Sequence, residues 1–89
     1  MELNTLFKLF GVDYSDPPNV TEIVRQTGIS YAHTCKTIIK LEKEGLLKTN
    51  INKKHKRVKL ISLTPKGVEI KKALEILRRN LKWQIKNNM

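Results

Sequence analysis

The 89-residue chain carries 18 lysine and arginine residues against 8 aspartate and glutamate residues, which gives a formal net charge of +10 at pH 7. A chain of this length is expected to form one small domain, close to the lower size limit for a core that is stable alone. The charge predicts a polyanionic partner, with nucleic acid as the first candidate and an anionic membrane surface as the second. The single cysteine excludes an internal disulfide framework.

The sequence carries no sign of export or of membrane insertion. Its start, MELNTLFKLFG, has an acidic residue at Glu2 and lacks the basic start and small-residue cleavage site of a signal peptide. No apolar run approaches the ~20 residues that are needed to span a bilayer. We therefore expect a cytoplasmic protein without a membrane partner, located in the host cytoplasm if the source is a virus.

The first part of the chain predicts two short helices joined by a loop. Apolar residues at helical spacing indicate a first helix over residues 3–10, and Asp16-Pro17-Pro18 belongs to the loop. Asn19 can cap a second helix, since Glu22 follows three residues later in a capping-box-like pattern. Gly28 suits the left-handed residue that follows a helix end. The apolar residues are Leu3, Leu6, Phe7 and Phe10 in the first helix, and Val20, Ile23 and Val24 in the second.

A third helix follows a tight turn, capped by Ser30 and running to about Glu44. Thr34, Ile38 and Leu41 recur at spacings of four and three residues, which predicts one buried stripe. At 100° per residue, the opposite face is polar and is free to meet a partner. That face carries Ala32, His33, Lys36 and Lys40, with Tyr31 at its N-terminal end and with Cys35 and Ile39 on its flank.

The second part of the chain predicts a hairpin and a long helix. Gly45 is expected to end the third helix, and strands follow over residues 46–51 and 57–63 with a tip at residues 52–56. Thr64 can cap the last helix, because Pro65 suits the first helical position. The apolar stripe of this helix has the spacing of a short self-association seam and consists of Ile70, Leu74, Leu77, Leu81 and Ile85.

Three stretches of the sequence resemble the MarR-type (multiple antibiotic resistance regulator) branch of the winged-helix proteins. They are TEIVRQTGIS (Thr21–Ser30), KLEKEGLLK (Lys40–Lys48) and RVKLISLTPKG (Arg57–Gly67). In length and charge the chain is similar to small archaeal and archaeal-virus proteins of this type. The resemblance implies an α+β, mostly helical fold: a winged helix-turn-helix with a two-stranded wing and a C-terminal dimerisation helix. The expected single domain spans residues 1–89, with the helix-turn-helix at about 19–44, the wing at about 46–63 and the C-terminal helix at about 65–86.

The same resemblance implies DNA contacts by the third helix and by the wing. In the family an arginine of the wing tip enters the minor groove, and Arg57 stands at that position. His55 stands where the family has an acidic residue, and Lys36 stands at an arginine position of the recognition helix. The expected DNA-binding residues are Ser30, Tyr31, Ala32, His33, Lys36 and Lys40 on the recognition helix and Lys53, Lys54, His55, Lys56 and Arg57 on the wing.

The wing also stands out by its charge. No acidic residue occurs between Glu44 and Glu69, while five cations fall within residues 53–59. A charge run is often only a solvated loop. Beside a helix-turn-helix pattern we interpret it as a phosphate-binding surface, because cations that neutralise phosphates release counterions from DNA.

No catalytic pattern is visible in the sequence. It has no nucleophile–base pair at a recognisable spacing, no phosphate-binding glycine loop and no clustered carboxylate pair, so we expect neither an enzyme nor a cofactor. Cys35 could be a redox sensor, a disulfide partner or a metal ligand with His33. One cysteine and two histidines make a poor set for zinc, which takes about four ligands, and a plain packing role is preferred.

These features lead to an expected function. We expect a homodimer that binds double-stranded DNA at specific sequences and regulates transcription, with Ile70, Leu74, Leu77, Leu81 and Ile85 in the dimer interface. Relatives of this type use additional helices to build a ligand pocket, so no small-molecule ligand is expected. The main alternative is an architectural chromatin protein that coats DNA without sequence preference. A protein-interaction module of the same shape is a second alternative, and RNA binding lacks the support of an aromatic stacking platform.

Overall fold

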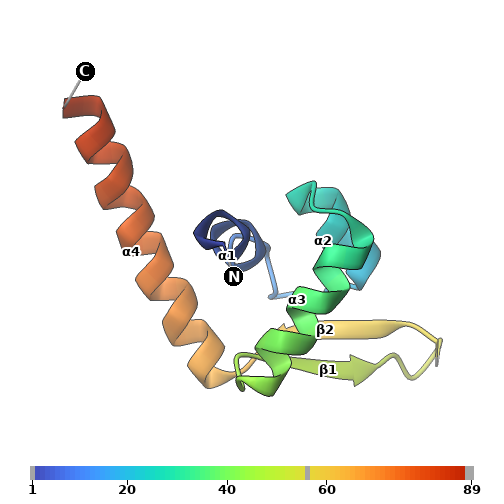
Figure 1. The fold of residues 1–89 in the computed structure, drawn as a ribbon. Helices are drawn as coiled ribbons and strands as arrows, with labels where there is room; N and C mark the ends of the chain where they lie inside the picture. Colours follow the sequence, from blue (N-terminus) through green and yellow to red (C-terminus); the bar gives the residue numbers. More distant parts are fainter. Residues whose placement is uncertain (1, 56, 88–89) are drawn as a thin grey trace.

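Four helices and one two-stranded sheet make up the fold in a computed structural model that describes residues 2–55 and 57–87, with side chains as far as Leu81 (Figure 1). In chain order they are α1 (Leu3–Phe10), α2 (Val20–Thr27), α3 (Tyr31–Lys43), β1 (Leu47–Ile51), β2 (Lys59–Leu63) and α4 (Pro65–Asn87). The two strands are antiparallel, with Leu47 opposite Leu63 and Ile51 opposite Lys59. The predicted α+β, mostly helical class is therefore confirmed.

Side-chain caps fix the starts of the last three helices, as the sequence predicts. An Asn, Ser or Thr oxygen accepts a hydrogen bond from a first-turn N–H group that has no partner within the helix. The pairs are Asn19 Oδ1 with the Glu22 N–H (2.8 Å), Ser30 Oγ with the His33 N–H (3.3 Å) and Thr64 Oγ1 with the Gly67 N–H (3.0 Å). Gly28 and Gly45 follow α2 and α3 with φ angles of 73° and 78°, a left-handed conformation that glycine adopts without a Cβ clash.

The second strand of the hairpin is shorter than the sequence predicts. Strand β2 begins at Lys59, so Arg57 and Val58 belong to the connecting turn. Local hydrogen bonds explain the difference, because the Val58 N–H donates to the His55 carbonyl (2.9 Å) and the Asn52 N–H donates to the Val58 carbonyl (2.9 Å). Arg57 consequently lies on the turn of the wing and outside the ladder of the sheet.

The sheet is tied to the helix-turn-helix by the segment that precedes α2. The Ile61 N–H donates to the Pro18 carbonyl (2.8 Å), and Asn19 forms an antiparallel bridge with Leu60. Both Pro18 and Ile61 are buried. The hairpin therefore projects past α2 and α3 from a fixed base (Figure 1).

The hydrophobic core lies where α1, α2 and α3 meet the sheet. The predicted buried stripe of α3 is confirmed, since Thr34, Ile38 and Leu41 are all buried. Leu3, predicted on the apolar face of α1, is exposed, because Thr5, Leu9 and Phe10 form the buried face of that helix and Leu3 lies in its first turn. The buried apolar residues are Leu9, Phe10, Val12, Tyr14, Ile23, Ile38, Leu41, Leu46, Leu47 and Ile61.

Helix α4 packs on the core through its first half. Ile70 and Leu74 are partly buried against the core, and Lys71 Nζ donates to the Val12 carbonyl (3.1 Å). The rest of α4 extends away from the other elements (Figure 1), and the molecule measures 50 × 26 × 22 Å along its principal axes. Within the described residues, no helix has both the length and the apolarity to cross a bilayer.

A Thr34→Val substitution is expected to stabilise this fold. The Thr34 side chain is 0% exposed, and its Oγ1 has no hydrogen-bond partner among the described residues. An unpaired buried hydroxyl costs about 1–3 kcal/mol, and valine replaces it with a methyl group of similar size. We expect the free energy of unfolding to rise by about 1 kcal/mol. The urea midpoint at constant m-value measures this change, and a lower midpoint would show that the hydroxyl is paired in solution.

Candidate nucleic-acid interface

The outward face of α3 presents the recognition-helix residues that the sequence predicts. All six are exposed: Ser30, Tyr31, Ala32, His33, Lys36 and Lys40. The Ser30 side chain also caps the helix, which fixes the position of the first turn. The face therefore offers two ammonium groups, an imidazole and a phenol to a partner from one rigid helix.

The turn of the wing presents the second predicted group. Lys53, Lys54, His55 and Arg57 are exposed, and Lys56 lies outside the described residues. The Lys54 N–H donates to Asn52 Oδ1 (2.9 Å), which braces the start of the turn. The wing thus holds a group of cations at the end of a short, hydrogen-bonded hairpin.

A groove between α3 and the wing connects these two surfaces, and we call it the wing groove. Two adjoining hollows of about 330 and 340 Å³ form it, and Val20, Cys35 and Lys59 line both. The first hollow is also lined by Asn19, Thr21, Tyr31, Arg57 and Val58, and the second by Ile38, Ile39, Glu42, Thr49, Ile51 and Ile61. One end of the wing groove is therefore polar and cationic, and the other end is largely apolar.

Glu42 is the one acidic residue that lines the wing groove in the described part of the chain. Its Oε2 accepts a hydrogen bond from Thr49 Oγ1 (3.0 Å), which joins α3 to β1. This carboxylate is engaged with the protein itself. Two cations, Lys59 and Arg57, line the groove with this one carboxylate, so its net charge is positive.

Ile39 is more exposed on this surface than its predicted place on the flank of α3 suggests. The sequence assigns Ile39 to the flank of α3, but its side chain is 55% exposed. Ala32, Lys36, Ile39 and Lys43 follow one another at spacings of four, three and four residues, and all four are exposed. Those spacings define one stripe on a helix, opposite the buried one, and they are the signal that identifies both Ile39 and Lys43.

The family comparison covers all of the elements that form this surface. Residues 6–67 match the profile of the winged helix DNA-binding domain family. The chain belongs to this family. The match begins in α1 and ends in the first turn of α4, so it includes the helix-turn-helix and the complete wing.

Solved structures of other winged helix proteins share the fold at low sequence identity. The PcaV transcriptional regulator from Streptomyces coelicolor, solved with its natural ligand, has a TM-score of 0.86 at 13% identity over 100% of this chain and 63% of that chain. FabT from Streptococcus pneumoniae, solved with DNA, has a TM-score of 0.79 at 13% identity over 100% of this chain and 62% of that chain. The transcriptional regulator BldR from Sulfolobus solfataricus has a TM-score of 0.84 at 19% identity over 93% of this chain and 60% of that chain.

The likeness between this chain and these solved structures is one of fold. PcaV and FabT are MarR-family regulators, so the predicted MarR-type resemblance is confirmed at the level of the fold. The winged helix chain spans 60–63% of the length of these three relatives. A comparison with proteins of curated function finds no significant match.

The predicted dimerisation stripe of α4 divides into two parts in this winged helix protein. Ile70 and Leu74 pack against the core of their own chain. Leu77 and Leu81 lie further along the helix and are 41% and 39% exposed. Ile85 lies outside the residues whose side chains the structure describes. The exposed part of the stripe therefore begins where α4 leaves the core.

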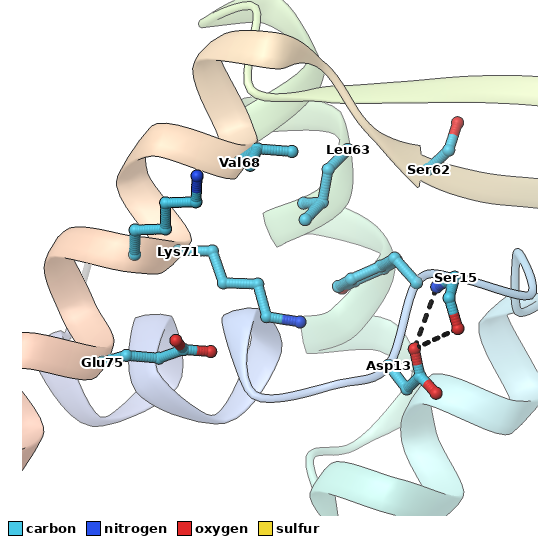
Figure 2. A pocket seen from close by; sticks show the side chains of 9 residues that line it. Asp13, Ser15, Ser62, Leu63, Val68, Lys71 and Glu75 are labelled. Atoms are coloured by element: carbon cyan, nitrogen blue, oxygen red, sulfur yellow. Dashed lines mark hydrogen bonds between the residues drawn. The ribbon is translucent and has the colours of Figure 1, made fainter.

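A further hollow of about 430 Å³ lies between β2, the start of α4 and the loop after α1 (Figure 2). Two of its charged residues, Lys71 and Asp13, are engaged within the chain. Lys71 Nζ donates to the Val12 carbonyl and lies 5.9 Å from the ring centroid of Tyr14. The Asp13 carboxylate accepts hydrogen bonds from the Ser15 Oγ (2.6 Å) and N–H (2.9 Å), and these bonds lower the pKa of Asp13. These contacts brace the loop against α4.

Cys35 has a free thiol in the described structure and is half-buried in the wall of the wing groove. The sequence leaves open a metal site shared with His33. Among the described residues, no cluster of three or more His, Cys, Asp or Glu side chains could hold a metal ion. It lines the apolar end of the groove together with Val20 and Ile39, which suits the packing role that the sequence favours.

Proposed function

We propose that this chain binds double-stranded DNA at specific sequences and regulates transcription in the cytoplasm as a homodimer. Residues 1–89 would act as one winged helix domain. The observation that carries the proposal is the wing groove, which joins the exposed face of α3 to the cationic turn of the wing. The DNA complex of FabT, a protein of similar fold, supports the same kind of partner.

The shape of this surface suggests how DNA would dock on it. A recognition helix fits the major groove, and side chains of its exposed face reach the base edges. The wing would then lie over the neighbouring minor groove. The sugar-phosphate backbone that separates the two grooves would cross the cationic end of the wing groove, where Lys59 and Arg57 can neutralise phosphates.

Roles for the candidate residues follow from this docking. Lys36 stands on the exposed stripe of α3, where its ammonium group can donate to a guanine edge, and His33 can donate to a base from the same helix. Lys53, Lys54, His55, Lys56 and Arg57 would contact phosphates or the minor groove. Ser30, Tyr31, Ala32 and Lys40 complete the proposed face of the recognition helix.

The proposed sequence-specific role of Lys36 can be tested by substitution. Lys36→Ala should lower the affinity for the preferred duplex by about 1–3 kcal/mol, with a smaller loss on random duplex DNA, because a base contact is made only at the correct sequence. Fluorescence anisotropy with both duplexes at one salt concentration measures the two losses. Lys72→Ala on α4, also an exposed lysine, is the matched control. Equal losses on the two duplexes would reduce Lys36 to a phosphate contact.

Homodimerisation is proposed to use the exposed part of the α4 stripe. Leu77 and Leu81 are four residues apart and therefore lie on the same side of the helix. Exposed leucines on a helix that extends beyond its own core are suited to pair with a second copy, because pairing removes both surfaces from water. A two-fold dimer would place two recognition helices in half-sites centred about 34 Å apart.

A Leu77→Asp, Leu81→Asp double variant should therefore be monomeric. Paired carboxylates in an apolar seam are strongly unfavourable, since a buried charge needs a partner. Light scattering gives the mass, and circular dichroism reports whether the fold is kept. Ile76→Asp is the control, because Ile76 is 58% exposed on α4 but lies off the stripe. A folded double variant that remains dimeric would place the dimer interface elsewhere.

A further inference from the structure

The outward stripe of α3 carries an exposed apolar side chain among its lysines, which the positive charge of the domain does not explain. Between Lys36 and Lys43 it exposes Ile39, an aliphatic side chain that is 55% accessible to water. A single exposed isoleucine is unremarkable on a protein surface. Ile39, however, continues into the apolar end of the wing groove, which Val20, Ile38 and Ile51 line with it. Ile51 is itself 63% exposed. An apolar patch thus lies within a cationic surface.

The charge around this patch selects the kind of molecule that can cover it. Lys36, Lys40 and Lys43 are exposed on α3, and Lys59 faces the patch from β2. Glu42, the acidic residue of the groove, accepts a hydrogen bond from Thr49 and keeps its negative charge, so the four lysines outnumber it. Four ammonium groups around an apolar centre favour a polyanion that also carries an apolar group. Duplex DNA has one such group at the base edges of its major groove, the 5-methyl group of thymine.

We infer that Ile39 reads thymine by contact with its 5-methyl group in the major groove. This inference rests on the proposed function and adds to it a specificity-determining residue and the base that the residue selects. Lys36 lies three residues before Ile39 on the same stripe, so a guanine-edge contact and a methyl contact fall on neighbouring base pairs. The preferred site should therefore contain an A·T pair that cannot be replaced by A·U without loss.

The test removes each methyl group in turn. The probe is the duplex that the wild-type protein selects from a random-sequence library. Each thymidine is replaced singly by deoxyuridine, which keeps the base pair and lacks only the methyl group. Affinities are measured by anisotropy at fixed salt for the wild type, Ile39→Ala and Ile76→Ala. Ile76 is 58% exposed on α4 and serves as the matched control. Alanine favours the helix at both sites.

The expected result is a coupling between one methyl group and one side chain. The wild type and Ile76→Ala should lose about fourfold in affinity at one thymine, the worth of burying a methyl group. The affinity of Ile39→Ala for the thymine duplex should be several-fold lower than that of the wild type. Ile39→Ala should bind the matching deoxyuridine duplex as tightly as it binds the thymine duplex. Two results would overturn this inference alone. Ile39→Ala could still lose about fourfold in affinity when deoxyuridine replaces the thymine, or it could bind the thymine duplex as tightly as the wild type does. If the wild type selects no duplex, both the proposed function and this inference fail.

Discussion

Gly67→Ala is expected to destabilise the protein by about 3 kcal/mol or more, a large part of the stability of a small domain. Glycine to alanine inside a helix normally stabilises by up to about 1 kcal/mol. Here the sign reverses, because a Cβ built at Gly67 would lie 2.0 Å from the Leu46 carbonyl oxygen. That carbonyl accepts a hydrogen bond from the Thr64 N–H (3.2 Å), so the backbone cannot yield without losing this contact.

Urea unfolding followed by circular dichroism measures the effect. Glu69→Ala is the control, since Glu69 is exposed two residues further along α4 and should change the midpoint only slightly. An unchanged or higher urea midpoint for Gly67→Ala would mean that Gly67 does not lie this close to the Leu46 carbonyl in solution. The DNA affinity of any folded fraction is a separate readout, because Gly67 is buried away from the proposed interface.

Removing three cations from the wing is expected to have the largest effect on DNA binding. The Lys53→Ala, Lys54→Ala, Arg57→Ala variant should bind every duplex more weakly, and its plot of log K against log salt should become shallower by about 2–3 units. Each phosphate contact contributes roughly one released counterion to this slope. The three side chains are exposed, and no acidic residue occurs between Glu44 and Glu69 to neutralise them within the chain segment.

The control is a second triple variant that removes the same charge elsewhere. Lys8, Lys72 and Arg79 are exposed on α1 and α4, and their replacement by alanine should leave the salt slope nearly unchanged. Anisotropy titrations at several salt concentrations give both slopes. An equal reduction in the two variants would indicate a response to net charge alone and would remove the wing from the interface.

Local features of the fold follow directly from the sequence. Asn19, Ser30 and Thr64 are predicted as caps and act as caps, because capping depends on hydrogen bonds within one turn of the same helix. The buried stripe of α3 also follows from spacing alone. The start of β2 at Lys59 does not follow from the sequence, because it depends on the hydrogen bonds that Val58 makes with His55 and Asn52 across the turn.

Features that depend on contacts between distant segments escape sequence analysis. Gly67 is recognisable as part of a motif, but the need for glycine arises from its contact with Leu46, 21 residues earlier. The α4 stripe has one spacing, yet Ile70 and Leu74 pack within the chain while Leu77 and Leu81 remain exposed. Periodicity identifies an apolar face and does not identify what covers it. The wing groove likewise exists only once the hairpin is placed beside α3.

Selection of bound sequences from a random duplex library tests the central proposal most directly. A sequence-specific homodimer should enrich a two-fold symmetric site, with half-sites centred about one helical turn, roughly 10 base pairs, apart. Its affinity for that site should exceed its affinity for random DNA by about 10³ or more. Strong binding without any enrichment would contradict the proposal and would instead support a protein that coats DNA through charge alone.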